Sequence, residues 1–147
     1  SQPLTTSIWK TWEKDTDWSK LDSLSELSKF TLYNSDIISF HTYGDINEMK
    51  LRVEQLEIYN RPIMCTEYLA RSQGSTFQAM LPLLKEKQIA AINWGFVSGK
   101  TNTIFPWSSW DEDFTSAPEV WHHDIMLPDK TPYDQAEIDF IKEITSN

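Results

Sequence analysis

Residues 61–68 read Arg-Pro-Ile-Met-Cys-Thr-Glu-Tyr, a short apolar run between a proline and a glutamate. Its apolar run lacks the alternation of polar and apolar residues that a half-exposed strand shows, which is typical of a strand covered on both faces. Pro62 ends any helix that precedes it, and Glu67 follows the run directly. We therefore predict a buried strand over residues 63–66 that closes on an acidic side chain.

Similar apolar runs lie on both sides of this stretch, and helical patterns separate them. The predicted strands are short runs of β-branched, aromatic or other apolar residues at 4–9, 36–41, 63–66 and 89–94. The predicted helices have apolar residues three or four apart and cover 21–30, the stretch from Asp45 to the stop at 60–62, and the stretches that begin at Ser75 and Asp134. Capping-box spacing marks the start of the last three helices, at Asp45 with Glu48, Ser75 with Gln78, and Asp134 with Glu137.

This alternation of strands and helices predicts an α/β fold with parallel strands and right-handed crossovers. Pro82 interrupts the third helical pattern and indicates a kink there. An open doubly wound sheet and a (β/α)8 barrel both fit the pattern, and periodicity alone does not separate them. In either architecture the ligand lies at the carboxyl ends of the strands.

Composition limits the function further. The chain has 147 residues, a formal net charge of −9 and one cysteine, with a mean hydropathy of −0.48. This describes a single globular domain over 1–147, and the acidic balance argues against nucleic acid as a partner. No apolar run is long enough to cross a membrane, and from the first residues of this sequence we expect no signal peptide. Cys65 alone forms neither an intramolecular disulfide nor a cysteine-based zinc site.

Glu67 is the first candidate for a functional residue. A carboxylate at the end of a buried strand costs desolvation energy unless it is paired or takes part in chemistry. The alternative is a structural carboxylate bonded to Arg61, Arg71 or a loop amide.

Other polar and aromatic side chains follow the predicted strands. His41 and Tyr43 are two residues apart and share one face of a strand end. Both could bind a carboxylate or a sugar hydroxyl, although a histidine satisfied in the core is the alternative. Trp94 ends another strand, and Trp107 lies in an aromatic loop that runs from 95 to 121. Such rings form either a sugar-stacking platform or simple packing.

The adjacent residues His122 and His123 do not indicate a metal site, because neighbouring side chains point in different directions and no third ligand has a supporting spacing. No glycine-rich phosphate loop or nucleophile elbow is present. We therefore predict that the chain uses neither a metal nor an organic cofactor.

The segments 35–44, 61–68 and 91–97, together with the tail 121–134, resemble the later strands of cellulase-like glycoside hydrolases. These are (β/α)8 barrels of the broad retaining clan that includes cellulases, mannanases and xylanases. The resemblance implies that Glu67 is the nucleophile. It also implies that His41 or Tyr43 lies near this nucleophile and that Trp94 lines the subsite of the reacting sugar.

The chain departs from this family in one important respect. The family's general acid/base is a glutamate after an asparagine at the end of strand four, and no Asn-Glu-Pro occurs here. The pair Asn47-Glu48 is already placed at the start of a predicted helix. A full barrel needs about 250 residues, so the resemblance implies half of a TIM-type barrel, about strands five to eight. Such a piece is expected to be inactive, or nearly so, alone.

A half-barrel leaves two strand edges and an apolar inner face uncovered. We therefore expect self-association, as a homodimer of half-barrels, or pairing with an N-terminal half. The expected ligand is an oligo- or polysaccharide. The compartment stays open, with a secreted or periplasmic location favoured. Two other hypotheses remain: a non-catalytic carbohydrate-binding module that uses exposed tryptophans, Trp107 among them, and an unrelated α/β domain.

Overall fold

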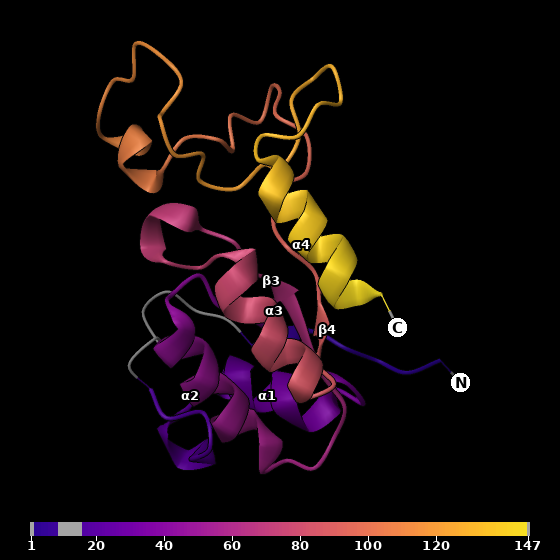
Figure 1. Ribbon diagram of the computed structural model, residues 1–147. Helices are drawn as coiled ribbons and strands as arrows, with labels where there is room; N and C mark the ends of the chain where they lie inside the picture. Colours follow the sequence, from indigo (N-terminus) through magenta and orange to yellow (C-terminus); the bar gives the residue numbers. More distant parts are fainter. Residues whose placement is uncertain (1, 9–15, 147) are drawn as a thin grey trace.

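The computed structural model describes residues 2–8 and 16–146, and it shows an α/β fold with a four-stranded parallel sheet (Figure 1). The strands, in sequence order, are β1 (Ser7–Ile8), β2 (Ile38–His41), β3 (Ile63–Glu67) and β4 (Ala90–Ala91). They lie side by side in the order β1-β2-β3-β4, and every neighbouring pair is parallel. The predicted α/β class and parallel pairing are therefore confirmed.

Helices connect the strands. The α-helices are α1 (Glu26–Asn34), α2 (Ile46–Glu57), α3 (Phe77–Glu86) and α4 (Gln135–Thr145), and short 3-10 turns are η2 (Leu21–Ser23), η3 (Arg71–Gln73) and η4 (Trp107–Trp110). Asp45 caps α2 as predicted, because its side chain accepts hydrogen bonds from the amides of Asn47 and Glu48. Asp134 caps α4 in the same way. No helix of the described residues is long and apolar enough to cross a membrane.

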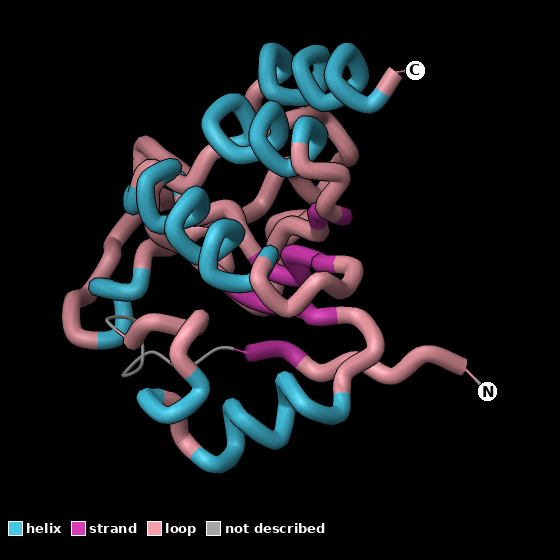
Figure 2. The backbone as a smooth tube through the Cα atoms, turned by 90° about the horizontal axis from the view of Figure 1, so that it is seen from below, coloured by secondary structure: helices cyan, strands magenta, loops and turns pink. Residues whose placement is uncertain are grey.

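The four α-helices lie on one side of the sheet. Viewed along the strands, they form an arc outside it, and no α-helix of the described chain lies on the opposite side (Figure 2). This follows from the strand order, since right-handed crossovers that always advance in the same direction place their helices on one face. The covered face carries alternate residues such as Phe40 and Cys65, which are buried against Met49, Leu56 and Met80 of the helices.

The other face of the sheet is polar at its centre. Ser7, Ser39 and Thr66 come from three neighbouring strands, and their hydroxyls form a chain of hydrogen bonds of 3.1 and 2.9 Å. Thr5 adds a bond of 2.9 Å to Ser39. The expectation of an apolar inner face is therefore wrong at this position. Hydroxyls that satisfy one another carry a much smaller desolvation cost than unpaired ones.

Helix α1 differs from the predicted helix over 21–30. The structure starts α1 at Glu26, after the N-cap Ser25, and residues 21–23 form a separate 3-10 turn. Leu27 and Phe30, two of the apolar residues that predicted this helix, are 65% and 63% exposed. A spacing of three residues drifts around a helix of 3.6 residues per turn, so an unbroken i, i+3 series cannot keep one face buried.

Three other boundaries differ from the predictions. The strand over 89–94 is paired only at Ala90–Ala91, and the strand over 4–9 only at Ser7–Ile8, while Trp9 lies outside the described residues. The N-cap of α3 is Thr76, because the hydroxyl of Ser75 instead accepts the amide of Leu69. Helix α3 continues through Pro82 without ending there.

Candidate functional site

The candidate site lies at the carboxyl ends of β2 and β3. An irregularity between Phe40 and His41 shifts the register, so that His41 lies opposite Glu67 in the sheet. The amide of Thr42 then bonds to the carbonyl oxygen of Glu67 at 3.1 Å and extends the pairing by one residue. The bulge therefore brings two of the predicted site residues together, which is the effect bulges often have next to functional sites.

Two side chains converge on one oxygen of Glu67. The hydroxyl of Tyr43 donates a hydrogen bond of 2.5 Å to Oε2, and Nδ1 of His41 lies 3.3 Å from the same oxygen. The second oxygen, Oε1, accepts no hydrogen bond from the residues that the structure describes, and the side chain is 23% exposed. A carboxylate held through one oxygen with the other open can act as a nucleophile, as a base or as a hydrogen-bond acceptor for a ligand.

The environment keeps both neighbours of Glu67 in their neutral forms near neutral pH. Burial raises the pKa of Tyr43 well above its usual value, and the hydrogen bond to Glu67 raises it further. Burial lowers the pKa of His41, although the charge of Glu67 opposes this shift. Tyr43 is thus a permanent donor to the carboxylate.

The arginines that could have neutralised Glu67 are engaged elsewhere. Arg61 donates to the carbonyls of Leu32 and Ser35, at 2.6 and 2.5 Å. Arg71 forms an ion pair of 2.6 Å with Glu137 of α4. Neither of these structural alternatives for Glu67 is therefore present.

An aromatic cluster supports Tyr43. Its ring packs edge-on against Trp107 at 5.4 Å and tilted against His123 at 5.5 Å. Trp107 also packs edge-on against His122 at 4.7 Å. The long loop thereby returns to the site, so the structure brings Trp107 against Tyr43, one of the predicted site residues.

His122 and His123 are buried parts of this support. Nδ1 of His122 is 2.7 Å from the hydroxyl of Ser72, and Nδ1 of His123 bonds to the carbonyl of Leu69. Burial lowers the pKa of His122 to about 4. Among the described residues, no group of three histidine, cysteine or acidic side chains is arranged to hold a metal ion.

Trp94 lies at the same end of the sheet but apart from the cluster. Its amide donates a hydrogen bond of 2.8 Å to the carbonyl oxygen of Tyr68, the residue after Glu67. Its side chain is 45% exposed, and it packs against no other ring in the described part of the chain. The structure thus places Trp94 beside the strand end without showing a contact with Glu67.

Two features that hold this end of the molecule together were missed in the sequence. Arg71 clamps the loop after residue 120, because it donates to the carbonyls of Trp121, His123 and Asp124 as well as to Glu137. Gly95 has a φ of +85°, and a Cβ there would lie 2.8 Å from Oδ1 of Asp124. A glycine directly after a predicted strand was a local signal for Gly95, whereas nothing near Arg71 pointed to a partner 66 residues away.

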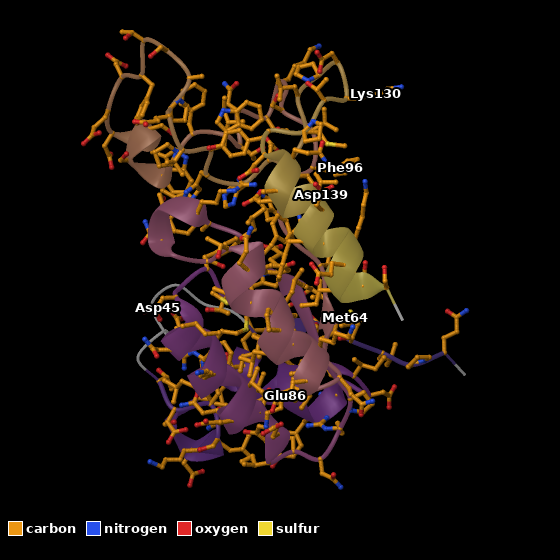
Figure 3. The ribbon with its side chains drawn as sticks, viewed as in Figure 1. Asp45, Met64, Glu86, Phe96, Lys130 and Asp139 are labelled. Carbon is orange, nitrogen blue, oxygen red and sulfur yellow. The ribbon has the colours of Figure 1, made fainter. Side chains whose placement is uncertain are left out.

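Two hollows on the surface of the described residues lie away from Glu67. One is lined by residues 19–23, and the other by Glu57 and residues 60–63 and 87–89. The loops of residues 92–134 lie beyond the carboxyl ends of the strands and carry many of the side chains at this end (Figure 3).

Comparisons with models of known families, with curated proteins and with solved structures found no match for this chain.

Proposed function

We propose that this chain is the C-terminal half of the (β/α)8 barrel of a retaining glycoside hydrolase that acts on β-linked polysaccharide. The observation that carries the proposal is the setting of Glu67, the proposed nucleophile. Its carboxylate ends a parallel strand, is oriented by Tyr43 through Oε2, and has Oε1 open among the described residues.

The arrangement of the sheet supports the barrel over a doubly wound sheet. A doubly wound sheet reverses its strand order at a switch point and carries helices on both faces. Here the order runs from β1 to β4 without reversal, and the α-helices lie on one side. Four more β/α units that continued the same arc would close a barrel of eight strands.

The chemistry follows from the two oxygens of Glu67. Oε1 attacks the anomeric carbon, a carbon–oxygen bond to the enzyme forms, and the glycosidic carbon–oxygen bond breaks. The leaving oxygen takes a proton from a general acid, which then deprotonates the water that releases the sugar. Tyr43 keeps Oε2 in place during attack, and His41 lies at the same oxygen.

Retaining hydrolysis needs a second carboxylate about 5 Å from the first. Glu48, from the Asn-Glu pair of this chain, lies in the first turn of α2 with Oε1 3.9 Å from Nε of Arg52. We therefore propose that the general acid comes from a polypeptide segment outside this chain. The chain alone is then expected not to hydrolyse natural glycosides, whose leaving groups need protonation.

An activated fluoro-sugar tests the nucleophile without the general acid. The dinitrophenolate group of a 2-deoxy-2-fluoro glycoside leaves without protonation. Glu67 of the isolated chain should therefore still be glycosylated by this reagent. Mass spectrometry of a protease digest should place the label in the peptide that contains Glu67. The Glu67→Gln variant should remain unlabelled, while Glu57→Gln, which changes an exposed acid on α2, should be labelled as the parent chain is.

Absence of label at Glu67, or equal labelling of Glu67→Gln, contradicts the proposal. The alternative of a non-catalytic carbohydrate-binding module predicts a different pair of results. Sugar binding would survive Glu67→Gln. In addition, substrate would not be turned over by any extended polypeptide that adds a segment with a candidate general acid. The exposed rings of Trp94 and Trp110 are the observation that favours this alternative.

A further inference from the structure

The short turn η4 presents two tryptophans on one side. A 3-10 helix has three residues per turn, so side chains three residues apart are eclipsed, about 6 Å apart along the axis. Trp107 and Trp110 have this spacing. Trp107 is 37% exposed and packs against the site, whereas Trp110 is 81% exposed. Within the described chain Trp110 packs against no other ring.

The turn is anchored to the site. The amide of Ser109 donates to Pro106 at 2.9 Å, and the amide of Glu112 donates to Ser108 at 2.8 Å. At its start, Trp107 is wedged against the rings of Tyr43 and His122. Trp110 is therefore exposed to solvent on a hydrogen-bonded turn. The first residue of this turn, Trp107, contacts the ring of Tyr43, whose hydroxyl binds Glu67.

The strand order indicates the direction of a bound chain. Since β3 lies between β2 and β4, Tyr43 and Trp94 follow the strands on opposite sides of Glu67. Figure 1 shows η4 on the side away from the segment that follows β4. Because Trp107 packs against Tyr43, η4 lies on the β2 side of Glu67, across from the segment that follows β4.

We propose that Trp110 forms an outer sugar subsite, one unit further from Glu67 than the unit that Trp107 borders. The subsite takes a neutral sugar, whose carbon–hydrogen face stacks on the indole ring. The next residues, Asp111, Glu112 and Asp113, are exposed acids that accept hydrogen bonds from hydroxyls and repel anionic sugars. This inference rests on the proposed function, because it places Trp110 relative to Glu67 as the nucleophile.

Indole NMR of the 15N-labelled chain tests the subsite. The parent chain and two variants, Trp110→Ala and Phe30→Ala, are titrated with β-1,4-linked hexaoses and disaccharides of glucose, mannose and xylose. Phe30 is the matched control, because it is 63% exposed on α1 and lies in a different part of the chain. Hexagalacturonate serves as the anionic probe.

We expect the parent chain and Phe30→Ala to bind one hexaose at least ten times more tightly than its disaccharide, about 1.4 kcal/mol. The Trp110 indole signal should move with the hexaose, and hexagalacturonate should not move it. Trp110→Ala should bind hexaose and disaccharide alike. A length preference that survives Trp110→Ala, equal binding of hexagalacturonate, or no binding of any hexaose overturns the inference.

The fluoro-sugar experiment separates this inference from the proposed function. If Glu67 is labelled but chain length has no effect on affinity, the outer subsite is wrong and the nucleophile stands. If Glu67 is not labelled while Trp110 still determines hexaose affinity, the catalytic proposal is wrong and Trp110 belongs to a binding surface.

Discussion

At the residue scale, the molecule depends on a few side chains that fit only one environment. Tyr43 is such a residue, because its hydroxyl donates to Glu67 while its ring packs against Trp107 and His123. Gly95 is another, because the chain after β4 passes close to Asp124. Gly95 lies where the loop that carries His123 meets the segment after β4, so it sets how closely the aromatic cluster approaches the sheet.

Gly95→Ala is expected to destabilise the protein by about 2–4 kcal/mol, through a left-handed backbone and a clash with a buried carboxylate. The new Cβ would lie 2.8 Å from both Asp124 Oδ1 and His123 Cβ. Gly99→Ala is the matched control, because nothing lies within 4 Å of its Cβ, and it should change stability by less than about 0.5 kcal/mol. Urea unfolding measures the free energy of unfolding of both variants. Equal losses in Gly95→Ala and Gly99→Ala would contradict the close approach of Gly95 to Asp124.

His122 should make stability depend on pH. Its pKa is about 4 in the folded chain because of burial, below the ordinary value of about 6.5 in the unfolded chain. Between these values the unfolded chain binds a proton that the folded chain does not, so the free energy of unfolding falls as pH is lowered from 6.5 to 4. The contribution is at most about 1.4 kcal/mol per pH unit.

The check is urea unfolding at several pH values, with His122→Gln compared with the parent chain. The variant should lose part of the dependence between pH 6.5 and 4. His41 and His123 contribute in the same direction, since burial lowers their pKa values as well, so part of the dependence should persist. Identical slopes in the two proteins would show that His122 titrates normally.

At the element scale, one buried ion pair joins segments that are distant in sequence. Arg71 of η3 binds both oxygens of Glu137 in α4, at 2.8 and 2.6 Å, and both side chains are less than 10% exposed. The same guanidinium holds three carbonyls of residues 121–124. The clamp therefore fixes the C-terminal helix and the loop that carries His122 and His123.

Removing one partner of this pair should be costly. Glu137→Leu leaves a buried guanidinium without its counter-charge and is expected to lose about 3–5 kcal/mol. Arg71→Met should lose at least as much, because three carbonyls also lose their donor. The double variant should be more stable than the sum of the two losses predicts, and chemical unfolding of all four proteins gives the coupling. Simple additivity would show that the pair contributes nothing.

At the scale of the whole molecule, the sheet has two open edges. β1 and β4 each pair on one side only within the described residues. Large exposed apolar side chains gather near both edges. They are Leu4, which precedes β1, Leu27, Phe30 and Tyr33 on α1, which contacts β1, and Ile92, Trp94, Phe96 and Val97 after β4. Such surfaces are typical of interaction sites. If the chain is half of a barrel, as we propose, a second copy would pair its β1 edge with the β4 edge of the first.

We therefore expect a homodimer when the chain is studied alone. Multi-angle light scattering at micromolar concentration should give twice the mass of one chain. Ile92→Lys, next to the β4 edge, should shift the mass toward the monomer because it places a charge in the interface. Leu51→Lys is the control, since Leu51 is similarly exposed on α2, and it should leave the dimer intact. A stable monomer in the parent chain contradicts the expectation.

Local sequence patterns determined the class of fold and part of the site. Alternating short apolar runs and helical stretches predicted parallel β/α units, and Asp45 and Asp134 marked two helix starts correctly. These features depend on neighbours within a few residues, where the backbone geometry is nearly fixed. The position of Glu67 at a strand end could be predicted for the same reason.

The tertiary structure alone decided which side chains meet. The pairing of Arg71 with Glu137, and of Trp107 with Tyr43, joins residues more than 60 positions apart. The bulge that sets His41 opposite Glu67 depends on the register between two strands. Contacts of this kind follow from how strands align and where a long loop returns to the sheet. The periodicity of a single segment determines neither of these.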